Sequence, residues 1–278
     1  RPFRGYTAGS MVVDSPKERA LDNHPTERFT TRVDNYVRYR PDYPAGIISL
    51  LQREIGLAAN WTIADIGSGP GNLTRRFLDL GSSVFGVEPN QAMREAGEVL
   101  MANDANFTSI AGTAEATTLP DVSVNLVTAG QAFHWFDPAP ARHEFRRILT
   151  VPGWVALIWN RRPERGSAIH EAHHEMLQQY SSEYDRVVVR DSSTQEGMAI
   201  LFGDRGYREF VLPHEQQLDA TAYWGRLLSS SYTPLPGEPG HDEIHQRSQE
   251  IFETPAQDGI VRFPYETEVF LGQVLASD

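Results

Sequence analysis

The sequence predicts an α/β fold of the Rossmann-like, doubly wound type. We expect a seven-stranded sheet, mostly parallel with an antiparallel last strand, plus a helical cap insertion. A short apolar run, Trp61 to Ile66, precedes three glycines within five positions and then apolar residues at helical spacing. A second run, Ser83 to Val87, ends in the acidic Glu88. Later apolar runs alternate with helical patterns, the order that βαβ units produce.

Composition excludes several classes of function. The chain has 278 residues, of which 40% are hydrophobic, so it is long enough to bury a full core. It carries 25 Lys and Arg against 37 Asp and Glu, a formal charge of -12, which disfavours nucleic acid as a partner. The absence of cysteine excludes disulfides and thiolate catalysis. No apolar run approaches about 18 residues, so we expect a cytoplasmic protein without membrane contact. The sequence gives no indication of oligomeric state.

The glycine-rich turn after the first strand predicts a nucleoside site. Gly67 and Gly69 can take positive φ in a tight turn, and Gly71 allows the helix that begins at Asn72 to pack closely. Glu88 follows at about the 20-residue distance where a nucleotide-binding βαβ unit places its ribose-binding carboxylate. We therefore expect Glu88 to bind a ribose diol, and Glu88→Ala to weaken cofactor binding.

The spacing of these glycines distinguishes among nucleoside cofactors. A dinucleotide site requires G-x-G-x-x-G, whereas residues 67–71 read G-S-G-P-G. Asp65, directly before the turn, would repel a phosphate and attract an ammonium group. S-adenosylmethionine has an ammonium group and a ribose diol but no phosphate, so it fits this pattern.

These motifs resemble those of class I S-adenosylmethionine-dependent methyltransferases. D-I-G-S-G-P-G at residues 65–71 resembles the first motif of that family, and V-E-P at residues 87–89 resembles the second. Ser68-Gly69-Pro70 stands where the family often has Cys-Gly-Thr. G-T-A-E at residues 112–115 corresponds to the segment that contacts adenine. The cofactor-binding residues expected from the turn and the resemblance are Tyr36, Arg40, Asp65, Gly67, Ser68, Gly69, Gly71, Glu88, Pro89, Met93, Ala114, Glu115, Gln131, Ala132 and Phe133.

The segment before the first strand predicts a lid. We expect residues 1–25 to form a tail or arm, residues 26–278 the methyltransferase domain, and residues 26–56 its lid. Y-R-P-D-Y-P at residues 39–44 resembles a segment of small-molecule methyltransferases of the trans-aconitate methyltransferase type. That resemblance makes Arg40 a candidate partner for the cofactor carboxylate and Tyr36 or Tyr39 a candidate wall beside the sulfonium. The alternative role of the tyrosines is aromatic packing.

Q-A-F-H-W-F-D at residues 131–137 follows the fourth strand, at the sheet edge where parallel sheets place their sites. It resembles a signature of one methyltransferase branch. His134 is the candidate general base, because its ordinary pKa near 6.5 suits proton abstraction. A structural role in the turn is its alternative. Trp135, Tyr39 and Arg161 are candidate substrate contacts, although paired arginines near a loop are commonly solvated.

Residues 163–200 interrupt the alternation of strands and helices, so we expect them to form the cap. His170, Glu171 and His174 match the H-E-x-x-H spacing of zinc proteases. Because this helix would be an insertion on a complete nucleotide-binding fold, we expect no metal. Pro264, within the final strand, predicts an edge strand or a bulge.

The expected function is methyl transfer from S-adenosylmethionine to a small-molecule acceptor at oxygen, carboxylate or carbon. Positioning in a dry pocket would supply most of the rate. A carboxylate acceptor would need no base and would favour Arg40, Arg161 or Arg162 as a clamp. A hydroxyl or carbon acceptor would need a base, for which His134 is the candidate. The alternatives are a methyltransferase-like protein that uses the cofactor as a scaffold or for cyclisation, an NAD-dependent oxidoreductase, and a metalloprotease.

Overall fold

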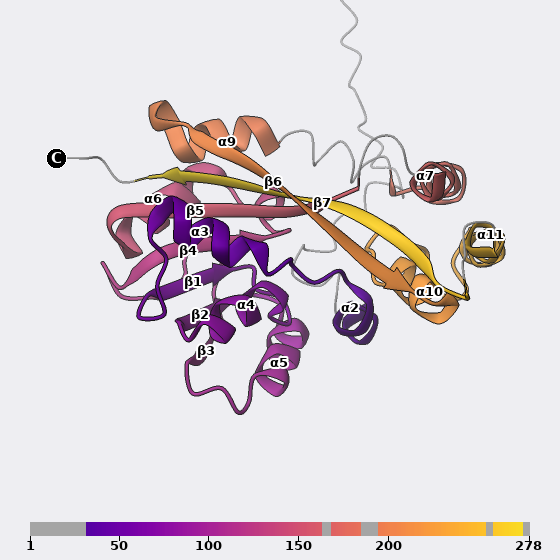
Figure 1. Cartoon of the computed structure of the whole chain (residues 1–278), viewed down its shortest axis with the longest axis horizontal. Helices are drawn as coiled ribbons and strands as arrows, with labels where there is room; N and C mark the ends of the chain where they lie inside the picture. Colours follow the sequence, from indigo (N-terminus) through magenta and orange to yellow (C-terminus); the bar gives the residue numbers. More distant parts are fainter. Residues whose placement is uncertain (1–31, 163–167, 185–193, 254–257, 275–278) are drawn as a thin grey trace, which may run out of the picture.

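The computed structural model describes residues 32–162, 168–184, 194–253 and 258–274. Seven strands form one sheet in the order β3-β2-β1-β4-β5-β7-β6 (Figure 1). The neighbouring pairs are parallel except for the two that involve β7, which runs antiparallel to both β5 and β6. The predicted seven-stranded sheet with an antiparallel last strand is therefore confirmed.

The elements of the core alternate along the chain. The strands are β1 (Thr62–Ile66), β2 (Ser83–Val87), β3 (Phe107–Ile110), β4 (Val124–Gly130), β5 (Leu149–Arg161), β6 (Tyr207–Leu218) and β7 (Val261–Gln273). The α-helices are α2 (Val33–Tyr39), α3 (Gly46–Ile55), α4 (Asn72–Leu80), α5 (Gln91–Leu100), α6 (Pro138–Ile148), α7 (Ala168–Tyr180), α9 (Thr194–Phe202), α10 (Ala220–Leu228) and α11 (His241–Glu253). Two short 3-10 helices are η2 (Phe133–Trp135) and η3 (Gly203–Arg205).

Apolar side chains bury both faces of the sheet. One hydrophobic cluster joins the strands to α6 and α9, with Phe145 and Phe202 fully buried. A second cluster joins the opposite face to α3 and α4, with Ile47 and Phe77 fully buried. The result is a three-layer core that holds the carboxyl ends of the parallel strands in place.

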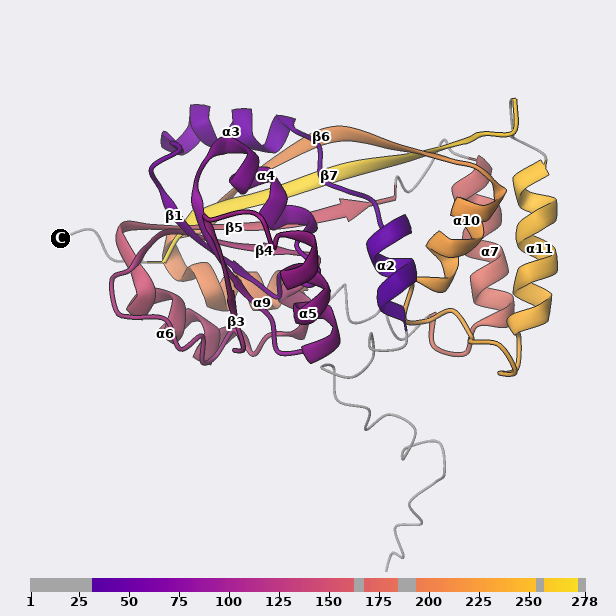
Figure 2. The same cartoon turned by 90° about the horizontal axis from the view of Figure 1, so that it is seen from below.

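A third cluster lies where β6 and β7 extend past the rest of the sheet. The register of β5 with β7 ends at Arg161 opposite Glu266, whereas β6 pairs with β7 as far as Val261. In this extension Val261, Phe263 and Tyr265 alternate toward one face and pack against α7, α10 and α11. Figure 2 shows these helices beside α2 at one end of the molecule. We call α2, α7, α10 and α11 the cap.

The cap differs from the sequence-based expectation in two ways. Helix α9, which falls within the expected insertion 163–200, packs on α6 in the core because its Met198, Leu201 and Phe202 are buried there. Helix α3, within the expected lid 26–56, packs in the core for the same reason. The cap is thus assembled from separate chain segments, with α2 as the contribution of the expected lid. Residues 1–31, 163–167 and 185–193, which complete the expected tail, lid and insertion, lie outside the described residues.

The expectation of an edge strand at Pro264 is wrong for β7 as a whole, because β7 lies between β5 and β6. At Pro264 itself, however, β7 pairs only with Glu215 of β6, since β5 has already ended. Proline is therefore placed where only one neighbouring strand is present, which reduces the cost of its missing N–H.

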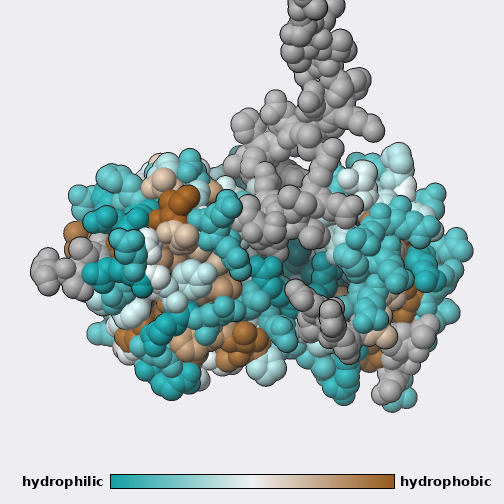
Figure 3. All heavy atoms as spheres, turned by 90° about the horizontal axis from the view of Figure 1, so that it is seen from above, coloured by the Kyte–Doolittle hydropathy of each residue, from teal (hydrophilic) through white to brown (hydrophobic). Residues whose placement is uncertain are grey.

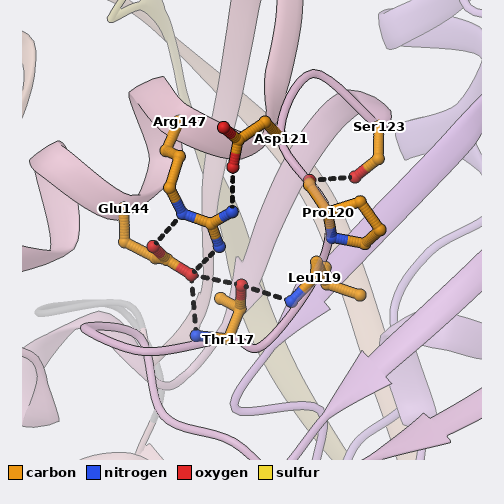
Figure 4. Close-up of polar contacts among 7 residues, drawn as sticks. All are labelled: Thr117, Leu119, Pro120, Asp121, Ser123, Glu144 and Arg147. Carbon is orange, nitrogen blue, oxygen red and sulfur yellow. Dashed lines mark hydrogen bonds and ion pairs between the residues drawn. The ribbon is translucent and has the colours of Figure 1, made fainter.

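A polar network fixes helix α6 to the loop that follows β3 (Figure 4). The Glu144 carboxylate accepts hydrogen bonds from the backbone N–H and the hydroxyl of Thr117. It also accepts from the Arg147 Nε and Nη2, at 2.8 and 2.7 Å. Arg147 in turn pairs with Asp121. Hydrogen bonds from Arg147, followed by those from Thr117, lower the pKa of Glu144 from 4.5 to about 2 against the opposing effect of burial.

This network predicts a pH-dependent contribution to stability. The pKa of Glu144 is lower in the folded state than in the unfolded state. Its stabilisation is therefore complete above the unfolded value of 4.5 and is lost as pH falls through about 2. We expect Glu144→Gln to lower the free energy of unfolding by roughly 3 kcal/mol at neutral pH. The difference in unfolding free energy between variant and wild type should vanish as the pH falls to about 2.

Urea unfolding across this pH range measures that difference. Glu215→Gln is the matched control, because Glu215 forms an exposed pair with Arg262. The control should change stability by less than about 1 kcal/mol at any pH. A pH-independent loss in Glu144→Gln would contradict the assignment of the stabilisation to the charged carboxylate.

Hydrophilic side chains dominate the described surface seen in Figure 3, and the apolar ones form separate patches. Within the described residues, no helix combines the length and the apolar character needed to cross a membrane.

Candidate functional site

A cavity of about 230 Å³ lies at the carboxyl ends of the parallel strands. Loops after β1, β2, β3 and β4 form most of it, and α2 and α5 complete the wall. Its lining residues are Tyr36, Gly67, Gly69, Glu88, Pro89, Asn90, Met93, Thr113, Ala114, Glu115, Gln131, Ala132, Trp135 and Phe136. The lining is mainly apolar, with two carboxylates. Such a surface suits a ligand with an aromatic base and a hydroxylated ring.

The glycine turn after β1 brings the backbone to the cavity. Gly67 has φ of 67° and donates its N–H to the Val87 carbonyl at 2.8 Å. A Cβ on Gly67 would lie 2.6 Å from the Ala132 Cβ, so only glycine fits between these two loops. Gly69 has φ of 54°, and a Cβ there would have no protein atom within 4 Å. Since Gly69 lines the cavity, that open space belongs to the ligand site.

Glu88, at the end of β2, presents a buried carboxylate to the cavity. Its Oε2 accepts the Gly69 N–H at 2.9 Å and its Oε1 accepts the Asn90 N–H at 2.8 Å. Burial raises the pKa of Glu88, and the two backbone hydrogen bonds oppose that shift. Each carboxylate oxygen can accept a further hydrogen bond. The carboxylate is therefore held rigidly while it retains capacity for a diol.

Asp65 lies beneath the turn and does not line the cavity. Its carboxylate accepts from the Thr74 hydroxyl at 2.7 Å and the Thr128 hydroxyl at 3.0 Å, which ties β1 to α4 and β4. Burial raises the pKa of Asp65 to about 6, and the threonine hydrogen bonds limit the rise. The observed contacts give Asp65 a role in positioning the turn, and its expected attraction for an ammonium group stays a prediction.

The Q-A-F-H-W-F-D segment forms a tight turn over the cavity. Gln131 has φ of 55°, donates its backbone N–H to the Ile158 carbonyl and donates its amide Nε2 to the Asn160 carbonyl. The Glu115 carboxylate accepts the Asp137 N–H at 2.9 Å, so the loop after β3 supports the other end of this turn. These contacts orient Trp135 and Phe136 toward the cavity.

The structure brings most of the expected cofactor residues together. The residues that line the cavity as expected are Tyr36, Gly67, Gly69, Glu88, Pro89, Met93, Ala114, Glu115, Gln131 and Ala132, with Trp135 from the expected substrate set. The expected residues outside the lining are Arg40, Asp65, Ser68, Gly71, Phe133, His134, Tyr39 and Arg161. Gly71 and Ser68 shape the turn, since Gly71 is the N-cap of α4 and donates to the Ser68 carbonyl. Phe133 is 3% exposed and packs edge-on against Trp159 in the core.

The expected catalytic and substrate residues have clear contacts. The His134 ring lies 5.1 Å from the Trp135 ring, on η2 and outside the lining, so its role as a general base stays a prediction. The Tyr39 carbonyl accepts a hydrogen bond from the Gln216 side chain on β6. The Tyr39 ring packs against Gly225, where a Cβ would clash with it, and this contact fixes α2 to α10. Arg161 forms an ion pair with Glu268, whose negative charge balances that of the guanidinium group.

Sequence reasoning missed three lining residues, Asn90, Thr113 and Phe136. Each is adjacent in sequence to a residue that was expected to line the site. Asn90 carried a further signal, because it is the N-cap of α5 and accepts the Met93 N–H through its side chain.

Of the histidines at the H-E-x-x-H match, His170 and the neighbouring His173 are buried in the cap interior, whereas His174 is exposed. The His170 ring contacts Phe263 with centroids 4.3 Å apart, and His173 Nδ1 lies 3.1 Å from the Tyr223 hydroxyl. His174 Nδ1 lies 2.9 Å from the Tyr184 hydroxyl. Among the described residues no group of three His, Cys, Asp or Glu is placed to hold a metal ion.

Comparisons with known proteins identify the core. Residues 64–157 match the methyltransferase domain family. An uncharacterized methyltransferase of Mycobacterium tuberculosis is 38% identical over 143 residues, which are 51% of this chain and 56% of that protein. An uncharacterized methyltransferase of Schizosaccharomyces pombe is 37% identical over 133 residues, 48% of this chain and 52% of that protein. The chain therefore spans about half the length of the curated relatives it matches.

Solved structures share the architecture. A protein of Anaeromyxobacter dehalogenans described as a type II methyltransferase superposes with a TM-score of 0.63 at 21% identity, over 86% of this chain and 100% of that one. The YcgJ protein of Bacillus subtilis superposes with a TM-score of 0.52 at 18% identity, over 83% of this chain and 99% of that one. At these identities the likeness shows the fold.

Proposed function

Residues 64–157 of this chain are a class I methyltransferase domain, and we propose on that premise that the protein transfers a methyl group from S-adenosylmethionine to a small-molecule acceptor. The observation that carries the proposal is the Glu88 carboxylate, held by two backbone N–H groups at the wall of an otherwise mainly apolar cavity. A ribose diol donates to such a carboxylate, and an adenine ring packs on the apolar wall.

The remaining lining residues fit the rest of the cofactor. Ala114 and the neighbouring Thr113 offer backbone and small side chains beside the base, and Met93 covers it. Gly69 leaves open space for a ligand at the turn. When bound, the cofactor supplies an electrophilic methyl group on sulfur. No residue of the chain needs to form a covalent bond in the transfer.

The protein's part in the reaction is positioning and exclusion of water. Tyr36, Trp135 and Gln131 surround the cavity from α2 and the turn after β4. Side chains of this kind hold an acceptor atom near the methyl group and keep solvent away, which supplies most of the rate in a direct displacement. An acceptor hydroxyl or carbon acid must also lose a proton, and His134 is the candidate base.

Calorimetric titration of the purified chain with S-adenosylhomocysteine and, separately, with NAD tests the site. We expect saturable binding of S-adenosylhomocysteine and none of NAD. A second measurement incubates the protein with methyl-labelled S-adenosylmethionine and a panel of small acids, alcohols and activated carbon acids, and follows label in the product. NAD binding in place of S-adenosylhomocysteine would refute the cofactor assignment. Tight binding with no transfer to any acceptor would instead indicate the scaffold or cyclisation alternative.

A further inference from the structure

Three arginines in or beside the cap, Arg40, Arg162 and Arg226, have no acidic partner among the described residues, and we call them the arginine cluster. Within the described residues, none of the three forms an ion pair or a hydrogen bond with a carboxylate. Their hydrogen bonds run from Arg40 Nη2 to the Ser229 carbonyl at 3.0 Å, from Arg162 Nη2 to the Tyr184 hydroxyl at 3.2 Å, from Arg226 Nε to the Tyr265 hydroxyl at 3.2 Å and from Arg226 Nη1 to the Ser230 hydroxyl at 3.0 Å. Arg162 also shares a side-chain hydrogen bond with Tyr232. The partners of the cluster are thus carbonyls and hydroxyls, and no carboxylate is among them.

Nearby arginines behave differently. Arg161 is adjacent in sequence to Arg162 and pairs with Glu268 on β7. Arg262, on the same strand, pairs with Glu215, and Arg147 in the core pairs with Glu144. Other arginines of the described structure thus pair with carboxylates, in a chain that carries 37 acidic residues. The arginine cluster lacks it.

The cluster is partly shielded from water, because Arg226 is buried while Arg40 and Arg162 have intermediate exposure. Arg226 is 7% exposed, and the Arg40 Nε is a buried donor with no hydrogen-bond acceptor. Burying a cation without a counter-charge costs free energy, because its hydration is lost and not replaced. An anion that entered this region would recover part of that cost.

The positive charge of the arginine cluster lowers the pKa of one nearby phenol, that of Tyr232. The Tyr184 and Tyr232 rings pack edge-to-face with centroids 5.1 Å apart, and Tyr184 accepts from Arg162. Burial tends to raise the pKa of Tyr232, yet the charges of Arg162, Arg226 and Arg40 together bring that pKa down to about 7. The cluster therefore favours negative charge at a position where the protein itself supplies only a phenol.

The cluster is close to the cofactor cavity. The Arg40 guanidinium carbon lies 5.0 Å from the centre of the Tyr36 ring, and Tyr36 lines the cavity. Both residues follow from one short segment, since Tyr36 lies on α2 and Arg40 is its C-cap. Arg40 therefore packs against a residue of the cavity wall, and we expect an acceptor bound in the cavity to reach the cluster past Tyr36.

We propose that the arginine cluster binds an anionic oxygen group, a carboxylate or a phosphate, carried by the methyl acceptor. The proposal rests on the function proposed above and names the acceptor class for it. Guanidinium groups bind both anions through paired hydrogen bonds, and a site of several arginines discriminates strongly against neutral analogues of the same shape. The cluster thus determines which small molecules reach the methyl group.

Titration of the full chain with simple anions tests the proposal. The probes are succinate, phenyl phosphate and the neutral analogue succinamide, each added to protein with and without saturating S-adenosylhomocysteine. We expect at least one anion to bind and succinamide not to bind. Preference for succinate or for phenyl phosphate identifies the anion. Absence of anion binding, or equal binding of succinamide, would overturn the proposal.

Arginine variants locate the binding. We expect Arg162→Gln and Arg226→Gln each to weaken anion binding about 10-fold or more. Arg262→Gln, which removes the same charge from an exposed pair on β7, is the matched control and should bind as wild type does. S-adenosylhomocysteine affinity is measured for every variant, because it reports both an intact fold and the cofactor site. Equal loss of S-adenosylhomocysteine affinity would assign the cluster to the cofactor's own carboxylate and overturn the proposal.

A measurement on the wild-type protein tests the proposal even if the arginine variants do not fold. The groups that face Tyr232 and carry or change charge are Arg40, Arg162, Arg226, Tyr184 and Tyr265. An anion bound among the three arginines offsets their charge, so Tyr232 should take up a proton on binding near pH 7.5. Calorimetry in two buffers of different ionisation enthalpy measures this uptake, which Tyr232→Phe should abolish. Binding with no proton uptake in wild type would place the anion elsewhere.

Discussion

Replacing Glu88 by alanine is expected to weaken S-adenosylhomocysteine binding about 100-fold. The carboxylate that accepts from Gly69 and Asn90 also lines the cavity, so the substitution removes the acceptor for the ribose hydroxyls. A hydrogen bond to a charged group contributes at least about 1.5 kcal/mol, and two at this lower limit give about 3 kcal/mol, which corresponds to roughly 100-fold.

Stability should change less than affinity in this variant. Burial raises the pKa of the Glu88 carboxyl, so removing it relieves a desolvation cost while two backbone N–H groups lose their acceptor. Calorimetric titration gives the affinity, and thermal unfolding gives the stability. Glu98→Gln is the control, because Glu98 lies on α5, is exposed and does not line the cavity. Unchanged S-adenosylhomocysteine affinity in Glu88→Ala would remove the ribose assignment.

Gly69→Ala is expected to reduce S-adenosylhomocysteine affinity about 10-fold or more while leaving the fold intact. The backbone at Gly69 has positive φ, so the added Cβ costs about 1 to 2 kcal/mol of strain. No protein atom lies within 4 Å of that Cβ, and Gly69 lines the cavity, so the methyl group takes space from the ligand. The loss of affinity comes from this obstruction.

Alanine variants at two other glycines distinguish the effect of backbone strain from that of obstruction of the cavity. Gly56 has φ of 73° at the end of α3 and also has open space around its Cβ, so Gly56→Ala should lose similar stability and keep full affinity. Gly67→Ala places a Cβ 2.6 Å from the Ala132 Cβ, and overpacking adds to its strain. It should have the lowest melting temperature of the three. If Gly56→Ala lost as much affinity as Gly69→Ala, obstruction of the cavity would be the wrong explanation.

The core of the fold was predictable because its signals are local. Helix α4 runs from Asn72 to Leu80 as expected, since Gly71 and Gly81 at its two ends both take the left-handed conformation. The strand before it and the turn after it carry the expected apolar and glycine patterns. The residues of loops that follow successive parallel strands meet at one edge of the sheet, which brought Gly69, Glu88 and Ala114 to one cavity.

The cap could not be predicted because its contacts are made between distant segments. An apolar helix face does not specify its partner, so α9 was assigned to the cap although Met198 and Phe202 pack in the core. Arg226 follows no motif, and it becomes notable only where folding places it beside Tyr265 and away from carboxylates. The sequence does not distinguish among Arg40, Arg161 and Arg162 as clamp candidates, because only the structure pairs Arg161 with Glu268.

The two strands that run from the core into the cap, β6 and β7, have a consequence for the engineering of such proteins. Because α7, α10 and α11 rest on the projecting part of this strand pair, the cap has no separate boundary at which it could be exchanged. The family model matches residues 64–157, which end before Arg162 and all three of these helices. Exchanging the cap for that of another protein therefore requires transplanting several separated segments together.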